Sequence, residues 1–592
     1  MNINHLLRIA CALFCATTVS TIFSAEQESS KARLYTSLVA QEASKNVARN
    51  KCNALLQSLT LREKIGQLFV APAASCFDQP EEALATSMRK SPYKMDPDYV
   101  KMLISKYHVG GLIFLYKSTP DLQIDATNEY QKLSKTPLLI TQDCEWGLSM
   151  RLYNTIRFPR NMTLGAIPDQ GLIYEMGNEV GRQCKAIGVH MNFAPVVDVN
   201  NNHDNPVIHD RSFGQDPHAV AQCGLLMMRG LRDGGVTPCV KHFIGHGDTK
   251  PGKSGSKDSH VDLPVVDYKR DRLNKVEIFP FKVLIDNDVP AVMSAHLAVP
   301  AFEKDENRAS SLSYSIITDL LEKELGFDGL KVTDGLGMEA LTKHYAPGQI
   351  ELEAFLAGND ILLCPVNVPV AVELIEQAIK EGKVTMQELD RRVMKILAVK
   401  SEAGVFDFKP IDKEKALAQL MTEHAQELKA KLYQQAITVI NKKAFTPIAD
   451  AKTTAVVQIG GKQESDFKQQ ITKTLPCTYY CQSAKGDEQE SDALLAKLEG
   501  ITTVIVPIFE MNKFAKQEYG LSDATLKLLA QLRALGKKTI IVPFGTPYSA
   551  SYFVDATSIV VAYEDDVEAQ KAAADVVVGK RIARGVLPVS IT

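Results

Sequence analysis

Short apolar runs recur between residues 65 and 365 and are separated by helix-like stretches such as 171–187 and 219–233. The runs cover 65–74, 109–116, 137–142, 188–198, 236–243, 290–298, 329–334 and 359–365. Continuous apolar runs are typical of strands buried on both faces, and their alternation with helices favours a parallel sheet. Eight such units predict a (β/α)8 TIM-type barrel. The alternative, an open doubly wound sheet, favours a glycine-rich phosphate loop after the first strand, where the sequence has none.

The pattern changes after residue 411. Residues 412–440 predict one long charged helix that links two domains. Apolar runs then return at 453–459, 502–508, 538–544 and 558–562. They predict a smaller α/β domain over 441–592. We therefore place the barrel domain at 59–411, after an N-terminal helical lead at 26–58.

Residues 1–25 have a composition of their own. A basic residue, Arg8, precedes an apolar and small run from Ile9 to Phe23. This pattern is typical of a secretory signal peptide, and the run is short for a membrane span. The alternative is an uncleaved anchor, because Phe23-Ser24-Ala25 fits the A-x-A cleavage pattern poorly. We predict an exported protein, periplasmic or secreted, with no membrane span after signal cleavage.

Composition narrows the class of protein. The 592 residues are 45% hydrophobic, as in soluble globular proteins. Because 67 Lys and Arg stand against 70 Asp and Glu, the net charge is −3, and we predict no nucleic-acid partner. The 11 cysteines show no CxxC or zinc-ligand spacing. Most are predicted to be small buried hydrophobes. Cys477 and Cys481 are the closest couple that could form a disulfide.

Polar side chains gather just after the predicted barrel strands. In a barrel these positions form the C-terminal face, where active sites are built. We therefore expect the functional site there. The residues are Asp143, Arg211, Lys241, His242 and Asp334.

The densest chemistry lies in the glycine-rich segment 241–264. Asp258 and His260 are two residues apart, so in an extended segment they project to the same side. A carboxylate beside an imidazole orients the ring and favours its charged form, which suits a general acid/base. One alternative is a zinc site, although HExxH-type spacing is absent. Another is a polar loop bonded to itself.

Asp334 ends an apolar run and is followed by glycines, in the segment 332–338. Such a carboxylate would face a pocket at the barrel mouth without covering it. It could act as a nucleophile toward an electrophilic carbon. A helix N-cap is the alternative for an aspartate at the end of a strand.

The segments around His260 and Asp334 resemble the signatures of glycoside hydrolase family 3, in its β-N-acetylglucosaminidase branch. Further stretches resemble the family in the same order, at 59–69, 141–147, 189–217 and 585–590. The resemblance implies a TIM-type barrel followed by an α/β sandwich domain. It also implies a carbohydrate substrate and no cofactor or metal.

The resemblance further implies a retaining double-displacement mechanism. Asp334 would be the nucleophile, and His260, held by Asp258, would be the acid/base. The implied activity is that of an exo-β-N-acetylglucosaminidase on peptidoglycan fragments or chito-oligosaccharides. The sugar would be held by Asp143, Arg211, Lys241 and His242.

The sequence also departs from the family pattern. Ile244 stands where the family has proline, Gly335 replaces a second aspartate, and Trp146 replaces a glycine. Trp146 could stack on a sugar face or fill a gap at the barrel mouth. The segment between Thr249 and Asp258 is longer than in the family. Its basic residues could contact an anionic substrate such as a muropeptide: Lys250, Lys253 and Lys257.

Three other functions remain open at this point. A β-glucosidase of the same family would take its acid from the second domain, with Glu510 as the candidate. A phosphorylase or transglycosylase would use the neutral histidine base toward a different acceptor. A non-catalytic wall-binding protein would keep the pocket without turnover.

Overall fold

The computed structural model describes residues 46–75, 95–253, 255–441 and 445–591. The predicted signal peptide and most of the predicted lead lie outside these residues. Residues 46–58 are helical and belong to a unit that ends at Leu59. Thr60–Thr592 form a second unit, which contains both the barrel and the smaller α/β domain.

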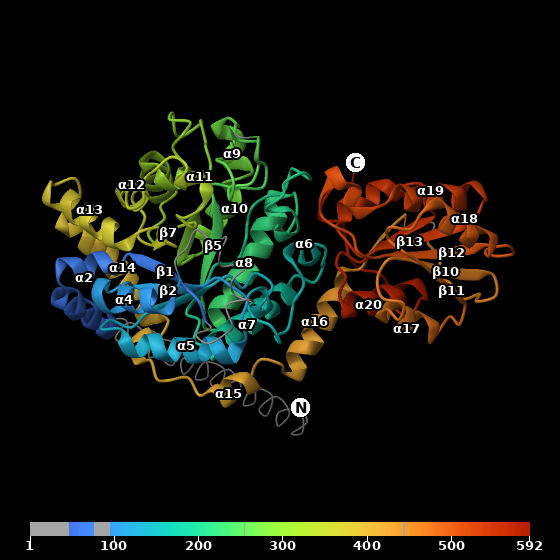
Figure 1. The fold of residues 1–592 in the computed structure, drawn as a ribbon, viewed down its shortest axis with the longest axis horizontal. Helices are drawn as coiled ribbons and strands as arrows, with labels where there is room; N and C mark the ends of the chain where they lie inside the picture. The colour runs from blue at the N-terminus through green and yellow to red at the C-terminus, as the bar shows by residue number, and fades with distance from the viewer. Residues whose placement is uncertain (1–45, 76–94, 254, 442–444, 592) are drawn as a thin grey trace, which may run out of the picture. The chain divides into compact units, whose positions relative to one another are not determined.

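Eight parallel strands form the barrel sheet in the order β7-β6-β5-β4-β3-β2-β1-β8. Figure 1 labels four of them, β1, β2, β5 and β7. The strands are β1 (Phe69–Ala73), β2 (Gly111–Phe114), β3 (Leu139–Gln142), β4 (Met191–Asn192), β5 (Thr237–Phe243), β6 (Ala291–Ser294), β7 (Leu330–Thr333) and β8 (Leu362–Leu363). β1 pairs with β8, and a parallel bridge from Val332 to Ile361 closes the ring. Each strand lies inside a predicted apolar run, and the TIM-type fold is confirmed.

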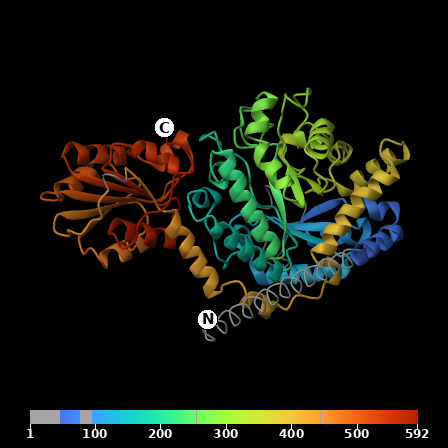
Figure 2. The same cartoon turned by 180° about the vertical axis from the view of Figure 1, so that it is seen from behind.

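Helices cover the outside of the barrel (Figures 1 and 2). They are α2 (Leu61–Gly66), α4 (Pro97–Tyr107), α5 (Pro120–Leu133), α6 (Asn161–Leu164), α7 (Gly171–Ala186), α8 (Pro217–Asp233), α9 (Arg270–Lys275), α10 (Phe279–Ile285), the π-helix η4 (Ser315–Glu324), α11 (Glu339–Thr342), α12 (Gln349–Ala357), α13 (Val368–Lys380) and α14 (Met386–Glu402). α7 packs closely on α8, because a Cβ at Gly177 would lie 2.7 Å from the Met227 carbonyl oxygen. Among the described helices, none is long and apolar enough to cross a membrane.

The segment 412–440 differs from the single helix that we predicted. It contains α15 (Lys413–Ala418), α16 (Glu423–Ala436) and the short strand β9 (Thr438–Ile440). Asp412 and Thr422 each accept a hydrogen bond from a backbone N–H of the following turn, so a new helix begins at each. The β-branched residues of β9 favour a strand. The prediction of one linker helix is therefore wrong.

The smaller domain is a sheet between two helical layers. Its strand order is β11-β10-β12-β13-β14-β9, and only β9 runs antiparallel to its neighbour. Figure 1 shows α18 and α19 on one face of the sheet and α17 and α20 on the other. The α/β sandwich is confirmed. The elements are β10 (Thr454–Ile459), α17 (Asp466–Thr472), β11 (Thr478–Gln482), α18 (Glu488–Ala496), β12 (Thr503–Ile508), α19 (Asp523–Ala534), β13 (Lys538–Pro543), β14 (Ser558–Val561) and α20 (Val567–Val577).

Seven cysteines of the described residues are free thiols: Cys144, Cys184, Cys223, Cys239, Cys364, Cys477 and Cys481. Most are buried, as the sequence predicts, whereas Cys477 is half-buried and Cys481 is exposed. No disulfide joins Cys477 to Cys481 in this structure.

Candidate active site

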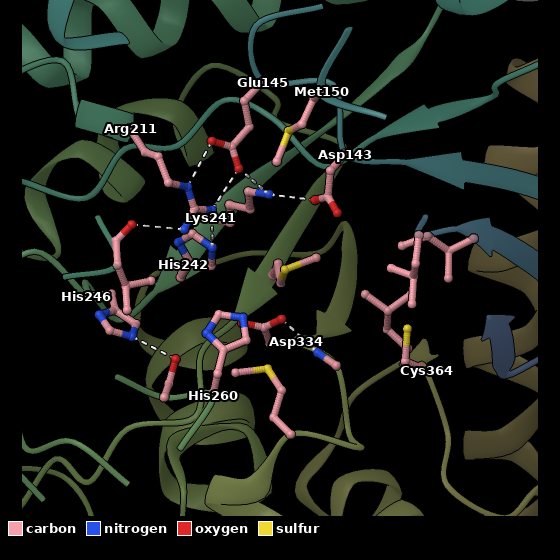
Figure 3. A pocket seen from close by; sticks show the side chains of 18 of the residues that line it. Asp143, Glu145, Met150, Arg211, Lys241, His242, His246, His260, Asp334 and Cys364 are labelled. Atoms are coloured by element: carbon pink, nitrogen blue, oxygen red, sulfur yellow. Dashed lines mark hydrogen bonds and ion pairs between the residues drawn. The ribbon is translucent and has the colours of Figure 1, made fainter. Parts of the chain in front are cut away.

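A pocket of about 410 Å³ opens at the carboxyl ends of the barrel strands. Asp143 follows β3, Lys241 and His242 lie near the end of β5, and Asp334 follows β7. Parallel strands of a closed barrel end at one rim, so residues far apart in sequence meet there. Figure 3 shows the side chains that line this hollow, including His260 from the loop after β5.

Lys241 and His242 both line the pocket although they are consecutive. In a regular strand, successive side chains point to opposite faces of the sheet. The register of β5 against β6 shifts between Val240 and Phe243. Such an irregularity re-aims side chains. It explains how one strand presents two neighbouring polar residues to the same pocket.

Two carboxylates and three cations form an ion cluster on one wall of the pocket. Lys241 Nζ lies 2.8 Å from Asp143 Oδ1 and 2.9 Å from Glu145 Oε1. Arg211 binds Glu145 with two hydrogen bonds of 3.0 and 2.7 Å. Arg151 Nη2 lies 2.5 Å from Asp143 Oδ2. The cluster therefore carries one net positive charge.

The pKa shifts within this cluster favour the charged form of its members. Burial alone would raise the pKa of Asp143, but Lys241 and Arg151 hold it well below its usual range. Burial likewise opposes ionisation of Glu145, whose pKa Arg211 and Lys241 lower strongly. The carboxylates in turn raise the pKa of Lys241 and of Arg211 against the effect of burial. The wall therefore offers charge-assisted hydrogen bonds to a polar ligand at neutral pH.

Glu145→Gln is expected to lower the free energy of unfolding by about 3 kcal/mol, because it leaves buried cations without their charged partner. Urea unfolding followed by fluorescence checks this, since Trp146 is the only tryptophan in the sequence and lies on the pocket wall. The matched control is Glu339→Gln, which breaks an exposed pair with Lys343. A far smaller loss is expected there. Equal losses in the two variants would contradict a stabilising role for the cluster.

Asp198 is fully buried and binds two histidines that line the pocket, His242 and His246. His242 Nδ1 lies 2.7 Å from Asp198 Oδ2, and the His246 backbone N–H donates to Asp198 Oδ1 at 2.7 Å. Arg211 Nη2 lies 3.2 Å from His242 Nε2. Because a guanidinium only donates, Nε2 accepts and the His242 proton sits on Nδ1. Burial lowers the pKa of His246 to about 4, so that ring is neutral near pH 7.

His260 and Asp258 form the pair that their spacing predicts. The His260 Nδ1 and the His260 backbone nitrogen each lie 2.8 Å from Asp258 Oδ1. The imidazole is 63% exposed and reaches the pocket, whereas Asp258 stands behind it. The hydrogen bond to Asp258 raises the pKa of His260, although burial opposes the shift, and the charge of Asp334 raises it further. His260 therefore presents Nε2 to the pocket with an enhanced tendency to carry a proton.

Asp334 is fixed at the end of β7. Its backbone N–H donates to the Ser294 carbonyl at 2.9 Å, and the Gly335 N–H donates to Asp334 Oδ1 at 2.7 Å. Among the described residues Oδ2 has no hydrogen-bond partner, so it is available to a ligand. Burial would raise the pKa of this carboxyl, but nearby histidines, His296 first, and the Gly335 N–H lower it. Asp334 is therefore an ionised carboxylate in the pocket.

The sequence predicts the main pocket residues but not several of their neighbours. The predicted residues Asp143, Arg211, Lys241, His242, His260 and Asp334 all line the pocket, and Asp258 holds His260. Glu145 is not among the predicted residues, although it stands two residues after Asp143 in the same motif. Arg151 and Asp198 are not among them either. Asp198 lies in an irregular stretch after β4, where no periodic pattern marks its contact with His242.

The loop lysines lie elsewhere than expected. Lys250 pairs with Asp267, and Lys253 donates to Asn307. Neither these two nor Lys257 lines the pocket. Besides the cations of the ion cluster, Arg160 and Lys513 line it.

Trp146 lies in the pocket lining, and the guanidinium carbon of Arg160 sits 4.3 Å from the centre of its ring. Glu510, the candidate acid of the β-glucosidase alternative, is not a lining residue and accepts a hydrogen bond from the Gly461 N–H at 2.9 Å. The described residues also contain no group of three or more His, Cys, Asp or Glu side chains that could hold a metal ion. The zinc alternative for the loop after β5 thus finds no ligand set in this part of the chain.

Comparison with known protein families identifies the chain. The model of the glycosyl hydrolase family 3 N terminal domain matches residues 60–399, which is more than half of the sequence. The chain belongs to glycosyl hydrolase family 3. This membership confirms the resemblance seen in the sequence and makes the protein a glycoside hydrolase.

Relatives of this family 3 protein extend over nearly the whole chain. Beta-hexosaminidase A of Pseudoalteromonas piscicida is 30% identical over 554 residues, covering 84% of this chain and 91% of that protein. The structure of a family 3 beta-N-acetylglucosaminidase from Paenibacillus sp. str. FPU-7 is 30% identical with a TM-score of 0.72, covering 90% of this chain and 99% of that one. The structure of beta-glucoside phosphorylase BglX has a TM-score of 0.74 and covers 92% of this chain and 96% of that one. At 19% identity it is similar in fold alone.

Proposed function

We propose that this family 3 glycoside hydrolase is a retaining exo-β-N-acetylglucosaminidase, which removes terminal β-linked GlcNAc from peptidoglycan fragments or chito-oligosaccharides. One observation carries the proposal: an ionised Asp334 and the His260–Asp258 pair share one pocket with a wall of charged hydrogen-bonding groups. The relatives named beta-hexosaminidase A and beta-N-acetylglucosaminidase support the same substrate class.

In the first step, Asp334 Oδ2 attacks the anomeric carbon of the bound sugar. The bond from that carbon to the leaving oxygen breaks, and His260 Nε2 gives its proton to the leaving oxygen. Asp258 accepts the hydrogen bond from Nδ1 throughout, which fixes the ring and stabilises its protonated form. The products are a glycosyl ester on Asp334 and a free alcohol.

In the second step, the now neutral His260 Nε2 takes a proton from water. The water oxygen attacks the anomeric carbon, and the carboxylate of Asp334 leaves. Two inversions at one carbon retain the β configuration. His260 ends the cycle protonated, as it began.

The ion cluster would hold the sugar that is cleaved. Asp143 accepts hydrogen bonds from hydroxyl groups, while Lys241 and Arg211 donate to hydroxyl or acetamido oxygens. Because the cluster is already paired within the protein, its side chains need little reordering when a sugar binds. This arrangement suits a multiply hydroxylated ring in the pocket.

The test compares 4-nitrophenyl β-GlcNAc with 4-nitrophenyl β-glucose. We expect kcat/KM to be at least about tenfold higher for the GlcNAc substrate, because a matched polar contact contributes about 1.4 kcal/mol or more. Preference for glucose would overturn the proposed substrate. Strong stimulation by phosphate with release of a sugar 1-phosphate would replace hydrolysis by phosphorolysis. Binding without turnover would indicate a non-catalytic protein.

For location, we propose export. The support is the pattern of residues 1–25 alone, a basic residue followed by an apolar run with small residues at its end. An exported enzyme would meet wall-derived GlcNAc glycosides directly. The proposal therefore agrees with the proposed substrate.

A further inference from the structure

A second hollow, of about 440 Å³, lies outside the catalytic pocket. Three tyrosines line it, Tyr519, Tyr548 and Tyr552, and we name it the tyrosine pocket. Loop residues of the barrel complete it, among them Asn200 and His203. None of these residues takes part in the proposed chemistry.

The back of the tyrosine pocket is firmly held. Tyr519 and Tyr548 are 4% and 7% exposed and belong to one hydrophobic cluster with Met162 and Val589. The Asn200 side-chain amide donates to the Tyr548 hydroxyl at 2.8 Å. Tyr519 has φ +55°, in the left-handed region that a bulky side chain rarely adopts. The protein therefore maintains an unfavourable backbone conformation that places an aromatic ring at this position.

The front of the tyrosine pocket is open. Tyr552 is 40% exposed, and its ring meets that of Tyr519 edge to face at 6.0 Å between centroids. Among the described residues, neither the Tyr519 nor the Tyr552 hydroxyl has a hydrogen-bond partner. An accessible aromatic face and two available hydroxyls thus look onto the same hollow.

The chemistry of this lining selects a class of ligand. Among the residues that the structure describes, no Asp, Glu, Lys or Arg lines the tyrosine pocket, and apart from the tyrosines only His203 has an ionisable side chain there. Aromatic faces attract the weakly positive C–H face of a sugar ring, while hydroxyls and amides bond to its hydroxyl groups. Neutral carbohydrate fits this combination better than an anion, a metal ion or a purely apolar molecule.

A third hollow, of about 250 Å³, shares one lining residue with the catalytic pocket and one with the tyrosine pocket. Lys513 lines both the catalytic pocket and this hollow, and Ala515 lines both this hollow and the tyrosine pocket. Phe514, between them in sequence, is 41% exposed and lines the third hollow. The three hollows therefore follow one another along residues 513–515.

We propose that the tyrosine pocket is a second carbohydrate-binding site, which holds sugar units of an oligosaccharide whose terminal GlcNAc occupies the catalytic pocket. The inference rests on the proposed function, since it assumes an oligosaccharide of β-linked GlcNAc. The chain would leave the catalytic pocket past Lys513 and Phe514. Its distant units would stack on Tyr552.

The kinetic test uses the full chain and chito-oligosaccharides of two to six units, with 4-nitrophenyl β-GlcNAc as the short reference. We expect Tyr552→Ala to lower the ratio of kcat/KM for the hexamer to that for the reference by roughly tenfold, the effect of losing one aromatic contact. The matched control is Tyr314→Ala, at a tyrosine that is 52% exposed on the barrel and lines none of the three hollows. It should leave the ratio unchanged. An unchanged ratio in Tyr552→Ala would overturn the proposal.

A binding test separates this inference from the proposed function. The hexamer is titrated calorimetrically into Asp334→Asn and into the same protein with Tyr552→Ala added. We expect roughly tenfold weaker binding in the double variant. Equal affinities, or no binding of the hexamer at all, would overturn the proposal that the tyrosine pocket binds carbohydrate. Failure of the proposed function would appear instead as absent turnover of 4-nitrophenyl β-GlcNAc by the unaltered protein.

Discussion

Asp334→Asn is expected to lower kcat for 4-nitrophenyl β-GlcNAc by at least about a thousandfold, because it removes the proposed nucleophile and leaves only binding and polarisation. Asparagine keeps the acceptor for the Gly335 N–H, so the fold should persist. Stopped assays over hours measure the remaining rate. A fluorinated GlcNAc analogue that slows the second step should label the unaltered enzyme, and peptide mapping should place the label on Asp334.

The control for this substitution is Asp319→Asn, at an exposed carboxylate on η4 that pairs with Lys323. It should retain nearly full activity and carry the label as the unaltered protein does. A label on any residue other than Asp334 would overturn the mechanism. Retention of more than about a tenth of the rate in Asp334→Asn would overturn it as well, since a nucleophile contributes far more than this.

His260→Ala is expected to cost about 100- to 10,000-fold in kcat/KM for GlcNAc glycosides with poor leaving groups, the usual range for general acid–base catalysis. The loss should shrink for a dinitrophenyl leaving group, because a stable anion departs without a proton. Added azide should then accelerate turnover and yield a β-glycosyl azide, since a small anion needs no base to attack. An equal loss for every leaving group would argue against an acid role of His260.

The pH profile tests how Asp258 acts on His260. The productive free enzyme has Asp334 ionised and His260 protonated, so kcat/KM should fall in acid as Asp334 gains a proton and in base as His260 loses one. The hydrogen bond to Asp258 is the main cause that raises the pKa of His260. Asp258→Asn should therefore move the alkaline limb to lower pH.

Asp267→Asn is the control for this shift, because Asp267 pairs with the exposed Lys250 in the same loop region and lies outside the pocket lining. The alkaline limb of the kcat/KM profile should stay in place in Asp267→Asn. If it also stays in place in Asp258→Asn, then Asp258 supports the loop without raising the pKa of His260.

Much of the fold could be predicted because burial leaves a local signature. All eight barrel strands are shielded on both faces, which requires continuous apolar runs. β11 escaped prediction because its residues Thr478–Gln482 are mostly half-buried or exposed and include no aliphatic residue. β9 escaped because three residues that follow a helical pattern give no period of their own. Both missed strands lie at edges of the smaller sheet. An edge strand has a neighbouring strand on one side only, so it needs fewer apolar residues.

The candidate site could be predicted only where chemistry and spacing coincide. Asp258 and His260 contact each other across two residues, so their pairing is local. Asp198 and His242 are 44 residues apart and meet because β4 and β5 are neighbouring strands of the sheet. The shift in register that aims Lys241 and His242 together depends on β6, a different part of the chain. Such long-range contacts follow from the assembled fold and leave no mark within either segment.

The antiparallel pairing of β9 with β14 decides where this chain can be divided. A fragment that starts at residue 441 would lack β9 and would leave the N–H and C=O groups along Ser558–Val561 open to pairing with another molecule. It would also lose α16, whose Lys429 lies 2.8 Å from Asp566 beside α20. Self-association is the expected behaviour of that fragment. A soluble version of the smaller domain should therefore begin upstream of α16, at about Met421.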